Sequence, residues 1–301
     1  MSIKENVLES KLWLSFSKRF PVSATKLLYR AAMKKKLDLK NPRTLTEKMQ
    51  WLKLNCYRNN SIVKQCADKY KVRSFIEDRG CSSILNVLYG VWDSVDEIDW
   101  DSLPNKFVIK CTHGSGYNYI CNNKNDLDKQ SLIKKIEGWM RETYGIKYCE
   151  LIYDKIRPRI IAEKFIETKD GKAPTDYKFF CTDGVPKFLY VMQGNDEIQD
   201  YYLANWEWLP VQSAARPNSN NTLKKPDGFS KMLEYAKILS KGLPLVRVDF
   251  YCENGTVIFG ELTFLTTGGY TKYSPEKYDL LFGEMFPDVR QLASVLNKQN
   301  K

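Results

Sequence analysis

The sequence contains very little histidine and no long run of apolar residues. Its single histidine is His113, so a Ser-His-Asp or Cys-His mechanism would depend on one residue that lies among glycines, where we expect a loop. No apolar run approaches the roughly 20 residues that a bilayer-spanning helix needs. Charged residues also interrupt the first positions, where a secretory signal would carry its apolar stretch. We therefore expect a cytoplasmic protein without a transmembrane helix.

Two familiar motifs are missing as well. The eight cysteines form no C-x-x-C pair, and with one histidine this excludes the usual zinc sites. We expect free, reduced thiols packed as small apolar side chains. The Walker A order of glycines followed by lysine and serine or threonine is absent, which excludes a P-loop.

The composition is that of a folded protein with a basic N-terminal part. Of 301 residues, 43% are hydrophobic, enough for a core in one or two domains. The net charge is +11, and residues 1–55 hold 13 basic and four acidic side chains. We expect peripheral contact with an anionic membrane, with a merely solvated face as the alternative. No recognition motif supports a nucleic-acid partner.

The periodicity changes twice along the chain. The first 66 residues favour helices, one of which begins with the capping-box pattern of Thr44 and Glu47. From about Asp68 helices alternate with strands, and after Arg159 strands dominate. The expected helices are 5–20, 23–36, 44–55, 69–78, 130–144, 230–241 and 287–296; the expected strands are 107–110, 119–121, 160–167, 176–181, 186–192, 245–251 and 257–264. The sequence therefore predicts an α+β protein with a basic, mainly helical N-terminal segment.

One apolar strand, 107–110, ends in Lys110 and leads into His113-Gly114-Ser115-Gly116. Backbone N–H groups of such a loop can surround phosphate oxygens, while the lysine adds a positive charge. An ordinary turn at the end of a strand is the alternative.

A polar patch interrupts the apolar hairpin 245–264. Strand alternation places Arg247 and Asp249 on one face, with Glu261 and Thr263 on the matching face of the second strand. Two carboxylates this close repel each other unless a cation lies between them, and their hard oxygens suit Mg²⁺. A cross-strand ion pair on a solvated face is the alternative.

The register of this hairpin depends on its turn. A two-residue Asn254-Gly255 turn would place Val248 opposite Glu261 and mix the two faces. We therefore predict a three-residue loop that pairs Arg247 with Glu261.

A third stretch joins two further strands. Glu163 and Lys164 end an apolar strand, where a hinge can offer backbone groups and charged side chains to a nucleobase. Lys178 lies in an aromatic strand, a costly position for an ammonium group without an anionic partner. An edge lysine that reaches solvent is the alternative.

Together these stretches resemble the ATP-grasp superfamily, and more closely its TupA-like branch of capsule and teichuronopeptide biosynthesis. The resemblance covers roughly residues 41–287. It is carried by Asn41-Pro-Arg-Thr44-Leu-Thr-Glu47-Lys48 with Trp51-Leu-Lys53, Ala67-Asp68-Lys69-Tyr-Lys-Val-Arg73, Leu103-Pro104 before Phe107-Val-Ile-Lys110, His113-Gly-Ser-Gly116, Asp176-Tyr-Lys178, Arg247-Val-Asp249 and Gly260-Glu261-Leu-Thr263-Phe264.

The resemblance implies two α+β subdomains that clamp ATP, at 67–165 and 166–301, behind the helical segment 1–66. It also implies roles for individual residues. The phosphates would be held by Lys69, Lys110 and Lys178 under the loop Gly114-Ser115-Gly116, and the adenine would contact Glu163, Lys164 and Ile166. Two Mg²⁺ ions would be bound by Asp249 and Glu261, with Thr263 at the position where the superfamily often has asparagine. The transferred phosphoryl group would be stabilised catalytically by Arg247, with Lys110 and Lys178.

The activity that the resemblance implies is ADP-forming ligation. A carboxylate would attack ATP to give an acyl phosphate, which an amine would convert to an amide on a cell-surface glycan. The partners would be a polymeric, nucleotide-linked or lipid-linked sugar acid and an amine. The loop after the hairpin is the candidate for gripping the acceptor, through Gly268, Gly269, Lys272 and Ser274, with an ordinary glycine turn as the alternative.

A glycosyltransferase of the same pathways is the competing hypothesis. It requires a D-x-D metal motif, and the sequence has Asp99-Trp-Asp101 and Asp126-Leu-Asp128. Both precede expected helix or turn starts, so capping explains them more simply.

Overall fold

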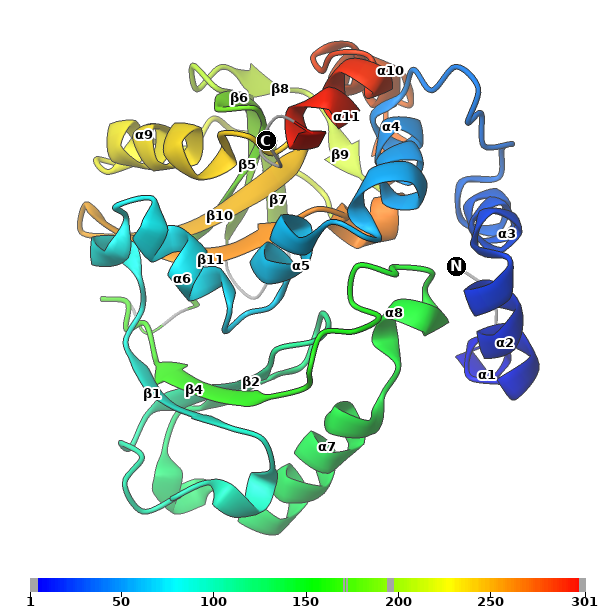
Figure 1. The fold of residues 1–301 in the computed structure, drawn as a ribbon. Coiled ribbons are helices and arrows are strands. Elements are labelled where there is room, and N and C mark those ends of the chain that lie inside the picture. Colours follow the sequence, from blue (N-terminus) through cyan, green and yellow to red (C-terminus); the bar gives the residue numbers. More distant parts are fainter. Residues whose placement is uncertain (1–4, 170, 172, 194–197, 298–301) are drawn as a thin grey trace.

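The described residues form two larger antiparallel sheets with their covering helices, a small two-stranded sheet and a helical arm (Figure 1). This computed structural model describes residues 5–169, 171, 173–193 and 198–297. The predicted α+β architecture with a helical N-terminal segment is confirmed. Among the described residues, no helix combines the length and the apolar character needed to cross a bilayer.

The smaller sheet holds Lys110, one of the lysines predicted to bind phosphate, on the face that lies toward the larger lobe. Its strands run in the order β1-β4-β2-β3, with bounds β1 (Leu88–Trp92), β2 (Phe107–Cys111), β3 (Asn118–Cys121) and β4 (Ile160–Lys164). Helix α7 (Lys129–Arg141) covers its outer face, where Leu132 packs in one apolar cluster with Phe107 and Ile109. Because side chains alternate along a strand, Val108 and Lys110 lie on the opposite face, which lines a cavity between the lobes.

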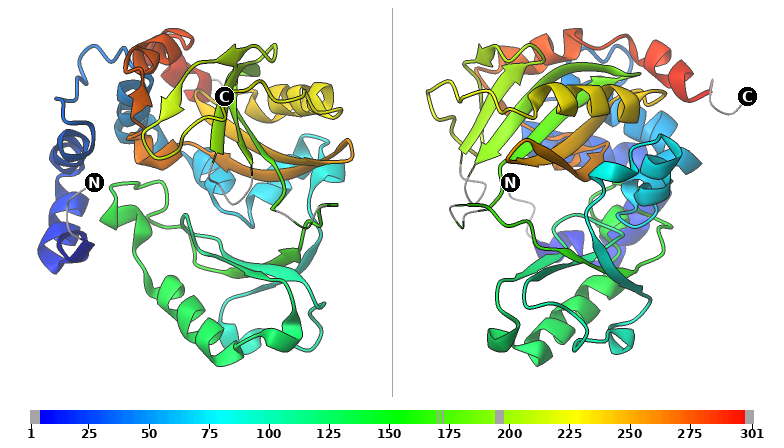
Figure 2. Two further views of the ribbon diagram at one scale, coloured as in Figure 1. Left: turned by 180° about the vertical axis from the view of Figure 1, so that it is seen from behind. Right: turned by 90° about the vertical axis from the view of Figure 1, so that its left-hand side faces the viewer.

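The larger sheet has the order β11-β10-β5-β6-β7-β8. Its strands are β5 (Asp176–Thr182), β6 (Val185–Gln193), β7 (Ile198–Leu203), β8 (Trp208–Leu209), β10 (Val246–Glu253) and β11 (Thr256–Thr263), and β9 (Gln212–Ser213) pairs separately with β12 (Tyr273–Ser274). Helix α9 (Phe229–Ser240) covers one face (Figure 2). There Phe179 contacts the rings of Phe229 and Phe250 at centroid distances of 5.9 Å each.

Further helices pack against the face of the larger sheet that is opposite α9, at one end of the sheet. They are α4 (Leu45–Leu52), a π-helical turn (Lys53–Tyr57), α5 (Ser61–Ala67), α6 (Val72–Asp78), α10 (Lys277–Glu284) and α11 (Val289–Asn297). Phe188 of the sheet stacks on Phe282 of α10 at 4.1 Å. The predicted capping box of Thr44 and Glu47 starts α4. Thus the residues from Leu45 through α6 pack with the larger sheet, although we expected them in the N-terminal segment and the smaller subdomain.

Only residues 5–33 form a separate arm, made of α1 (Glu5–Leu8), α2 (Lys11–Arg19) and α3 (Pro21–Met33). The arm rests on α8 (Tyr144–Lys147) of the smaller lobe. Trp13 Nε1 donates to the carbonyl of Lys147 at 2.9 Å, and Ser17 Oγ donates to the carbonyl of Ile146 at 3.0 Å. Lys147 also pairs with Glu9 at 2.6 Å. These contacts join two segments that lie about 130 residues apart in the sequence.

The predicted register of the β10–β11 hairpin is wrong. The turn is the two-residue Asn254-Gly255, with both φ angles positive at 51° and 75°, as a type I′ turn requires. A β-bulge then shifts the register between Val248 and Phe250, so that Arg247 lies opposite Thr263. The bulge restores the matching faces that we had assigned to a longer loop.

The sequence also left several elements unpredicted. Strands β1 and β7 and helix α10 were not expected as such. The remaining predicted strands occur within a few residues of their expected bounds. Tertiary pairing creates the missed strands, since neither has a strong alternation of its own.

We predict that Gly283→Ala destabilises the protein by at least about 2 kcal/mol. A Cβ atom at this position of α10 would lie 2.1 Å from the carbonyl oxygen of Arg43 and 2.7 Å from the amide of Leu45, so the two helices must separate. Chemical denaturation measures the change.

Gly138→Ala is the matched control. Gly138 lies within α7 and a Cβ there meets nothing within 4 Å, so we expect equal or up to about 1 kcal/mol higher stability. Equal stability of Gly283→Ala and wild type would refute the close approach of α10 to α4.

Candidate functional site

A cavity of about 540 Å³ lies between the two sheets. Ten of the residues predicted to bind nucleotide or metal line it: Lys69, Lys110, Ser115, Gly116, Glu163, Lys164, Ile166, Lys178, Asp249 and Glu261. These residues come from both sheets and from the loops between them, so the fold brings together groups up to almost 200 positions apart in the sequence. The cavity size is that of an ordinary ligand site.

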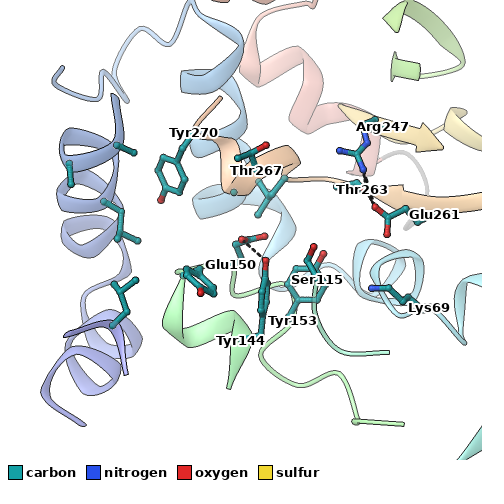
Figure 3. A pocket seen from close by; sticks show the side chains of 17 residues that line it. Lys69, Ser115, Tyr144, Glu150, Tyr153, Arg247, Glu261, Thr263, Thr267 and Tyr270 are labelled. Carbon is teal, nitrogen blue, oxygen red and sulfur yellow. Dashed lines mark hydrogen bonds and ion pairs between the residues drawn. The ribbon is translucent and has the colours of Figure 1, made fainter. Parts of the chain in front are cut away.

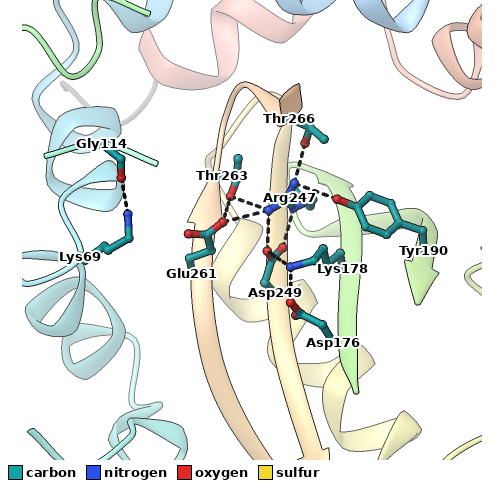
Figure 4. Close-up of polar contacts among 10 residues, drawn as sticks. All are labelled: Lys69, Gly114, Asp176, Lys178, Tyr190, Arg247, Asp249, Glu261, Thr263 and Thr266. Carbon is teal, nitrogen blue, oxygen red and sulfur yellow. Dashed lines mark hydrogen bonds and ion pairs between the residues drawn. The ribbon is translucent and has the colours of Figure 1, made fainter. Parts of the chain in front are cut away.

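Arg247 is the centre of the polar network on the larger sheet (Figure 4). Its Nε and one terminal nitrogen donate to the two carboxylate oxygens of Asp249, at 2.7 and 2.6 Å. The same terminal nitrogen donates to Glu261 at 2.9 Å, and the other one donates to the Tyr190 hydroxyl at 3.0 Å. This planar, two-point pairing is a geometry that arginine forms and lysine cannot.

Lys178 extends the network along β5. It lies opposite Asp249 in the sheet and donates to Oδ2 of that residue at 3.0 Å. It also forms a short contact with Asp176. The expectation that this lysine needs an anionic partner is met by two carboxylates, which raise its pKa well above the ordinary value in spite of burial.

Asp176 retains an unpaired oxygen. Its Oδ1 is buried and has no hydrogen-bond partner among the described residues. Burial and the charge of Asp249 raise the pKa of Asp176 to about 6, against the opposing effect of Lys178. A buried carboxylate oxygen without a partner is a costly group unless a ligand or cation meets it.

Glu261 is held as an anion. Burial by itself would raise the pKa of Glu261, but Lys69, Arg247 and Lys178 lower it to about 2. Its Oε1 accepts hydrogen bonds from Arg247 and from Thr263 Oγ1, the latter at 2.7 Å. Within the described part of the chain, Oε2 accepts no hydrogen bond.

The donor set fits a hard cation at two of these oxygens. Glu261 Oε2 and the buried Asp176 Oδ1 have no hydrogen-bond partner among the described residues, and both residues line the cavity. Both oxygens of Asp249, the predicted ligand, are instead held by Arg247 and Lys178. Thr263, the predicted third ligand, bonds to Arg247 and Glu261 and lines a neighbouring cavity. Over residues 5–169, 171, 173–193 and 198–297, no group of three or more His, Cys, Asp or Glu side chains is arranged to hold a metal ion.

Lys110 faces this network from the smaller lobe, and Lys69 faces it from the segment between α5 and α6. Lys110 pairs with Glu163 at 2.7 Å, and Arg73 approaches the other oxygen of Glu163 at 3.6 Å. The pairing raises the pKa of Lys110 against the effect of burial. Lys69 donates to the carbonyl of Gly114 and so anchors the predicted phosphate loop. The side chain of Glu163, predicted to meet adenine, therefore orients Lys110 in this structure.

The residues at the end of β4 and just after it could offer backbone N–H and C=O groups to a ligand. The amide of Lys164 donates to the carbonyl of Val87 at 2.9 Å, and the carbonyl of Lys164 accepts from Asn86 Nδ2 at 2.8 Å. No backbone hydrogen bond of Ile166 occurs within the described residues. Ile166 therefore provides the open backbone groups that a base could use, while Lys164 does not.

A second cavity, of about 300 Å³, adjoins the first (Figure 3). The two share Lys69, Ser115 and Glu261. The second cavity is also lined by Arg247 and by Glu150, which the sequence analysis missed. The available signal was a lone charge within the run Tyr148-Cys-Glu-Leu-Ile152.

The predicted acceptor loop is divided by the structure. Gly268 lines the second cavity. Gly269 packs against Gln50, whose Nε2 donates to both glycine carbonyls at 2.9 and 3.0 Å. Lys272 and Ser274 are exposed and line neither of the two cavities, so their position does not support the predicted acceptor role.

The D-x-D pairs and the single histidine have structural roles. Asp99 Oδ1 accepts from the amides of Asp101 and Ser102, and Asp128 caps α7. His113 is buried and its Nε2 donates to the carbonyl of Trp139 at 3.0 Å. None of these residues lines either cavity, which removes the basis for the glycosyltransferase hypothesis.

Comparison with known proteins gives one extensive match. Residues 47–287 match the family described as TupA-like ATPgrasp. No curated protein matches the sequence.

Several solved structures are also similar. N5-carboxyaminoimidazole synthetase from Staphylococcus aureus, complexed with ADP, has a TM-score of 0.44 and 15% identity over 73% of this chain and 52% of its own. D-alanine–D-alanine ligase from Bacillus anthracis has a TM-score of 0.43 and 14% identity over 86% and 73%. L-amino acid ligase from Bacillus licheniformis has a TM-score of 0.45 and 14% identity over 87% and 58%. The chain thus spans only about half the length of the first of these proteins.

The two carboxylates of the network differ in their importance for stability. Asp249 is 1% exposed, and Asp249→Ala leaves Arg247 and Lys178 without their shared partner, so we expect a loss of about 3 to 5 kcal/mol in the free energy of unfolding. The Glu261 side chain is 39% exposed, and Glu261→Gln should cost less than about 1 kcal/mol. Urea denaturation of both variants checks this order, and a larger loss for Glu261→Gln would contradict it.

Proposed function

We propose a function that starts from one established point: this chain belongs to the TupA-like ATP-grasp family. We infer that the larger cavity binds ATP with Mg²⁺, and that the enzyme is an ADP-forming ligase that joins a carboxylic acid to an amine. The observation that supports this most directly is the convergence of Lys69, Lys110 and Lys178 with Asp249 and Glu261 on one cavity between two sheets.

The nucleotide has one reasonable orientation in this cavity. Its triphosphate belongs beside Lys69, Lys110 and Lys178, because these are ammonium groups that line the cavity beside the glycine loop. Its base belongs at Ile166, where backbone groups are open. The amides of Ser115 and Gly116 then lie over the phosphates.

Magnesium would be held at Glu261 and Asp176, which both line the cavity and each keep one carboxylate oxygen without a hydrogen-bond partner among the described residues. The ion supplies charge neutralisation on the phosphates when it is bound. Arg247, fixed by Asp249, lines the second cavity and donates to Glu261, which lines both cavities. This fixed guanidinium can stabilise charge on the transferred phosphoryl group.

The chemistry then has two steps. A carboxylate oxygen of the acid forms a bond to the γ-phosphorus as the bond to the β-phosphate oxygen breaks, which gives an acyl phosphate and ADP. The amine nitrogen next attacks the acyl carbon, phosphate leaves, and an amide forms. Lys110, Lys178 and Arg247 position the reactants and balance charge, so no histidine base is required.

The biological setting that we propose is the synthesis of cell-surface polysaccharide, such as capsule or teichuronopeptide. The support is the family alone. The acid would be a uronic acid or similar sugar acid on a nucleotide, lipid or polymer carrier.

The ligase activity is tested by incubating the protein with ATP, MgCl₂, a panel of sugar acids and a panel of primary amines. We expect ADP release that requires both an acid and an amine, and a product lighter by one water than their sum by mass spectrometry. Lys110→Met should weaken ATP binding at least about tenfold, since it removes a buried charge contact, whereas Lys134→Met on the exposed side of α7 should not. Sugar transfer from a nucleotide sugar without ADP release from ATP would overturn the proposal.

We also propose that the arm touches an anionic membrane surface. Basic side chains such as Lys26 and Arg30 are exposed on it, beside exposed apolar side chains such as Leu12, Phe20 and Leu27, which are 85%, 50% and 52% exposed. This mixture is typical of segments that lie at a lipid interface.

Vesicle sedimentation tests the membrane contact. Binding to vesicles with phosphatidylserine should weaken with salt and fall several-fold in Lys26→Gln/Arg30→Gln. The control Lys231→Gln/Lys237→Gln, on α9, should bind as wild type does. Equal binding of both double variants would refute the assignment.

A further inference from the structure

The second cavity has two chemically different ends. One end carries Lys69, Arg247 and Glu261 and adjoins the proposed phosphate site. The other end is apolar and aromatic (Figure 3). It is lined by Leu8, Leu28, Ala31 and Ala32 of the arm, by Leu265, and by Tyr144, Tyr148, Tyr153 and Tyr270.

The arm contributes a regular stripe to this wall. Leu28, Ala31 and Ala32 follow helical spacing along one face of α3, and small alanines leave room that larger side chains would fill. Leu28 also packs in a cluster with Leu8 and Cys149. The wall is therefore fixed in place by packing.

Glu150 is the acidic group at the aromatic end. It is 4% exposed, and its Oε1 accepts a hydrogen bond from the Tyr144 hydroxyl at 3.3 Å. Its Oε2 has no hydrogen-bond partner among the described residues. The buried Lys53, whose charge acts on Glu150, donates to the Tyr270 hydroxyl at 3.2 Å. Among the described residues it forms no direct ion pair with Glu150.

Such a carboxylate favours a cationic ligand. Burial raises the pKa of Glu150 to about 7 although Lys53 opposes the shift, so the charged form is costly at this position. A ligand ammonium group would replace the missing hydrogen bonds and neutralise the charge, and tyrosine rings add attraction for a cation. A second carboxylate at this end would be repelled.

We propose that the second cavity binds the amine co-substrate, as a primary ammonium ion with an aromatic or aliphatic body that Glu150 and the tyrosines hold against α3. This assignment rests on the proposed ligase function, because only then does a molecule in this cavity meet an acyl phosphate at Arg247 and Lys69. It names the class of amine, and it makes the N-terminal arm part of the active site.

Three probes that share the 4-ethylphenol framework test the charge preference. Tyramine is a cation, 4-ethylphenol is neutral, and 3-(4-hydroxyphenyl)propionate is an anion, and all carry the same phenol ring. Saturation-transfer NMR on the full-length protein, with ATP affinity measured on the same sample, should show binding of tyramine at least tenfold tighter than of the other two. Glu150→Gln should remove that preference, and Ala32→Phe, which fills the cavity, should abolish tyramine binding.

Two matched variants should bind tyramine as wild type does. Glu142→Gln changes another carboxylate that accepts from a tyrosine hydroxyl, that of Tyr117, but does not line the cavity. Leu27→Phe enlarges an exposed residue of α3 that is also outside the cavity. They control for general effects of the substitutions.

The outcomes separate the two proposals. Wild-type protein that binds ATP but none of the probes, or binds the propionate best, overturns the amine assignment and leaves the ligase proposal standing. Tyramine binding that Ala32→Phe does not change also overturns it. Failure of wild type to bind ATP refutes the proposed ligase function itself.

Discussion

The buried pair of Arg247 and Asp249 is the interaction on which the site depends. Two charges that are 7% and 1% exposed pay a large desolvation cost, and the pair is tolerable only because each group has further partners. Asp249 has Lys178, and Arg247 has Glu261, Tyr190 and two threonines. The network therefore orients its side chains before any ligand arrives, which lowers the cost of organising a reaction.

Backbone geometry places this network as much as side-chain chemistry does. Glu261 reaches Arg247 because a bulge inserts an extra residue opposite Asp249. Gly260 favours that bulge, since a Cβ there would lie in tight contact, 3.1 Å from the carbonyl oxygen of Asp249. Alternation in the sequence predicted which residues share a face, but it cannot distinguish a longer loop from a tight turn followed by a bulge, because both give the same faces.

Features that depend on local sequence patterns could be predicted, whereas features that depend on contacts between distant segments could not. Lys110 and Lys178 follow from strand patterns and the cost of an unpaired lysine, and the structure places both at the larger cavity. The pairing of Asp249 with Lys178 could not be predicted, because β5 and β10 are distant in sequence and their register is set by packing. Glu150 was missed for a related reason: its surroundings come from the arm, the helix α8 region and the loop after β11, which meet only in the folded chain.

The arm connects these conclusions. The face of α3 that carries Leu28 and Ala32 lines the second cavity, while Lys26 and Arg30 are exposed. A helix has room for both because residues four apart share a face and residues two apart do not. A membrane contact and a substrate wall therefore make no competing demands on the same side chains. If both proposals hold, the exposed basic side chains of α3 meet the membrane, while its small apolar side chains limit the space for the co-substrate.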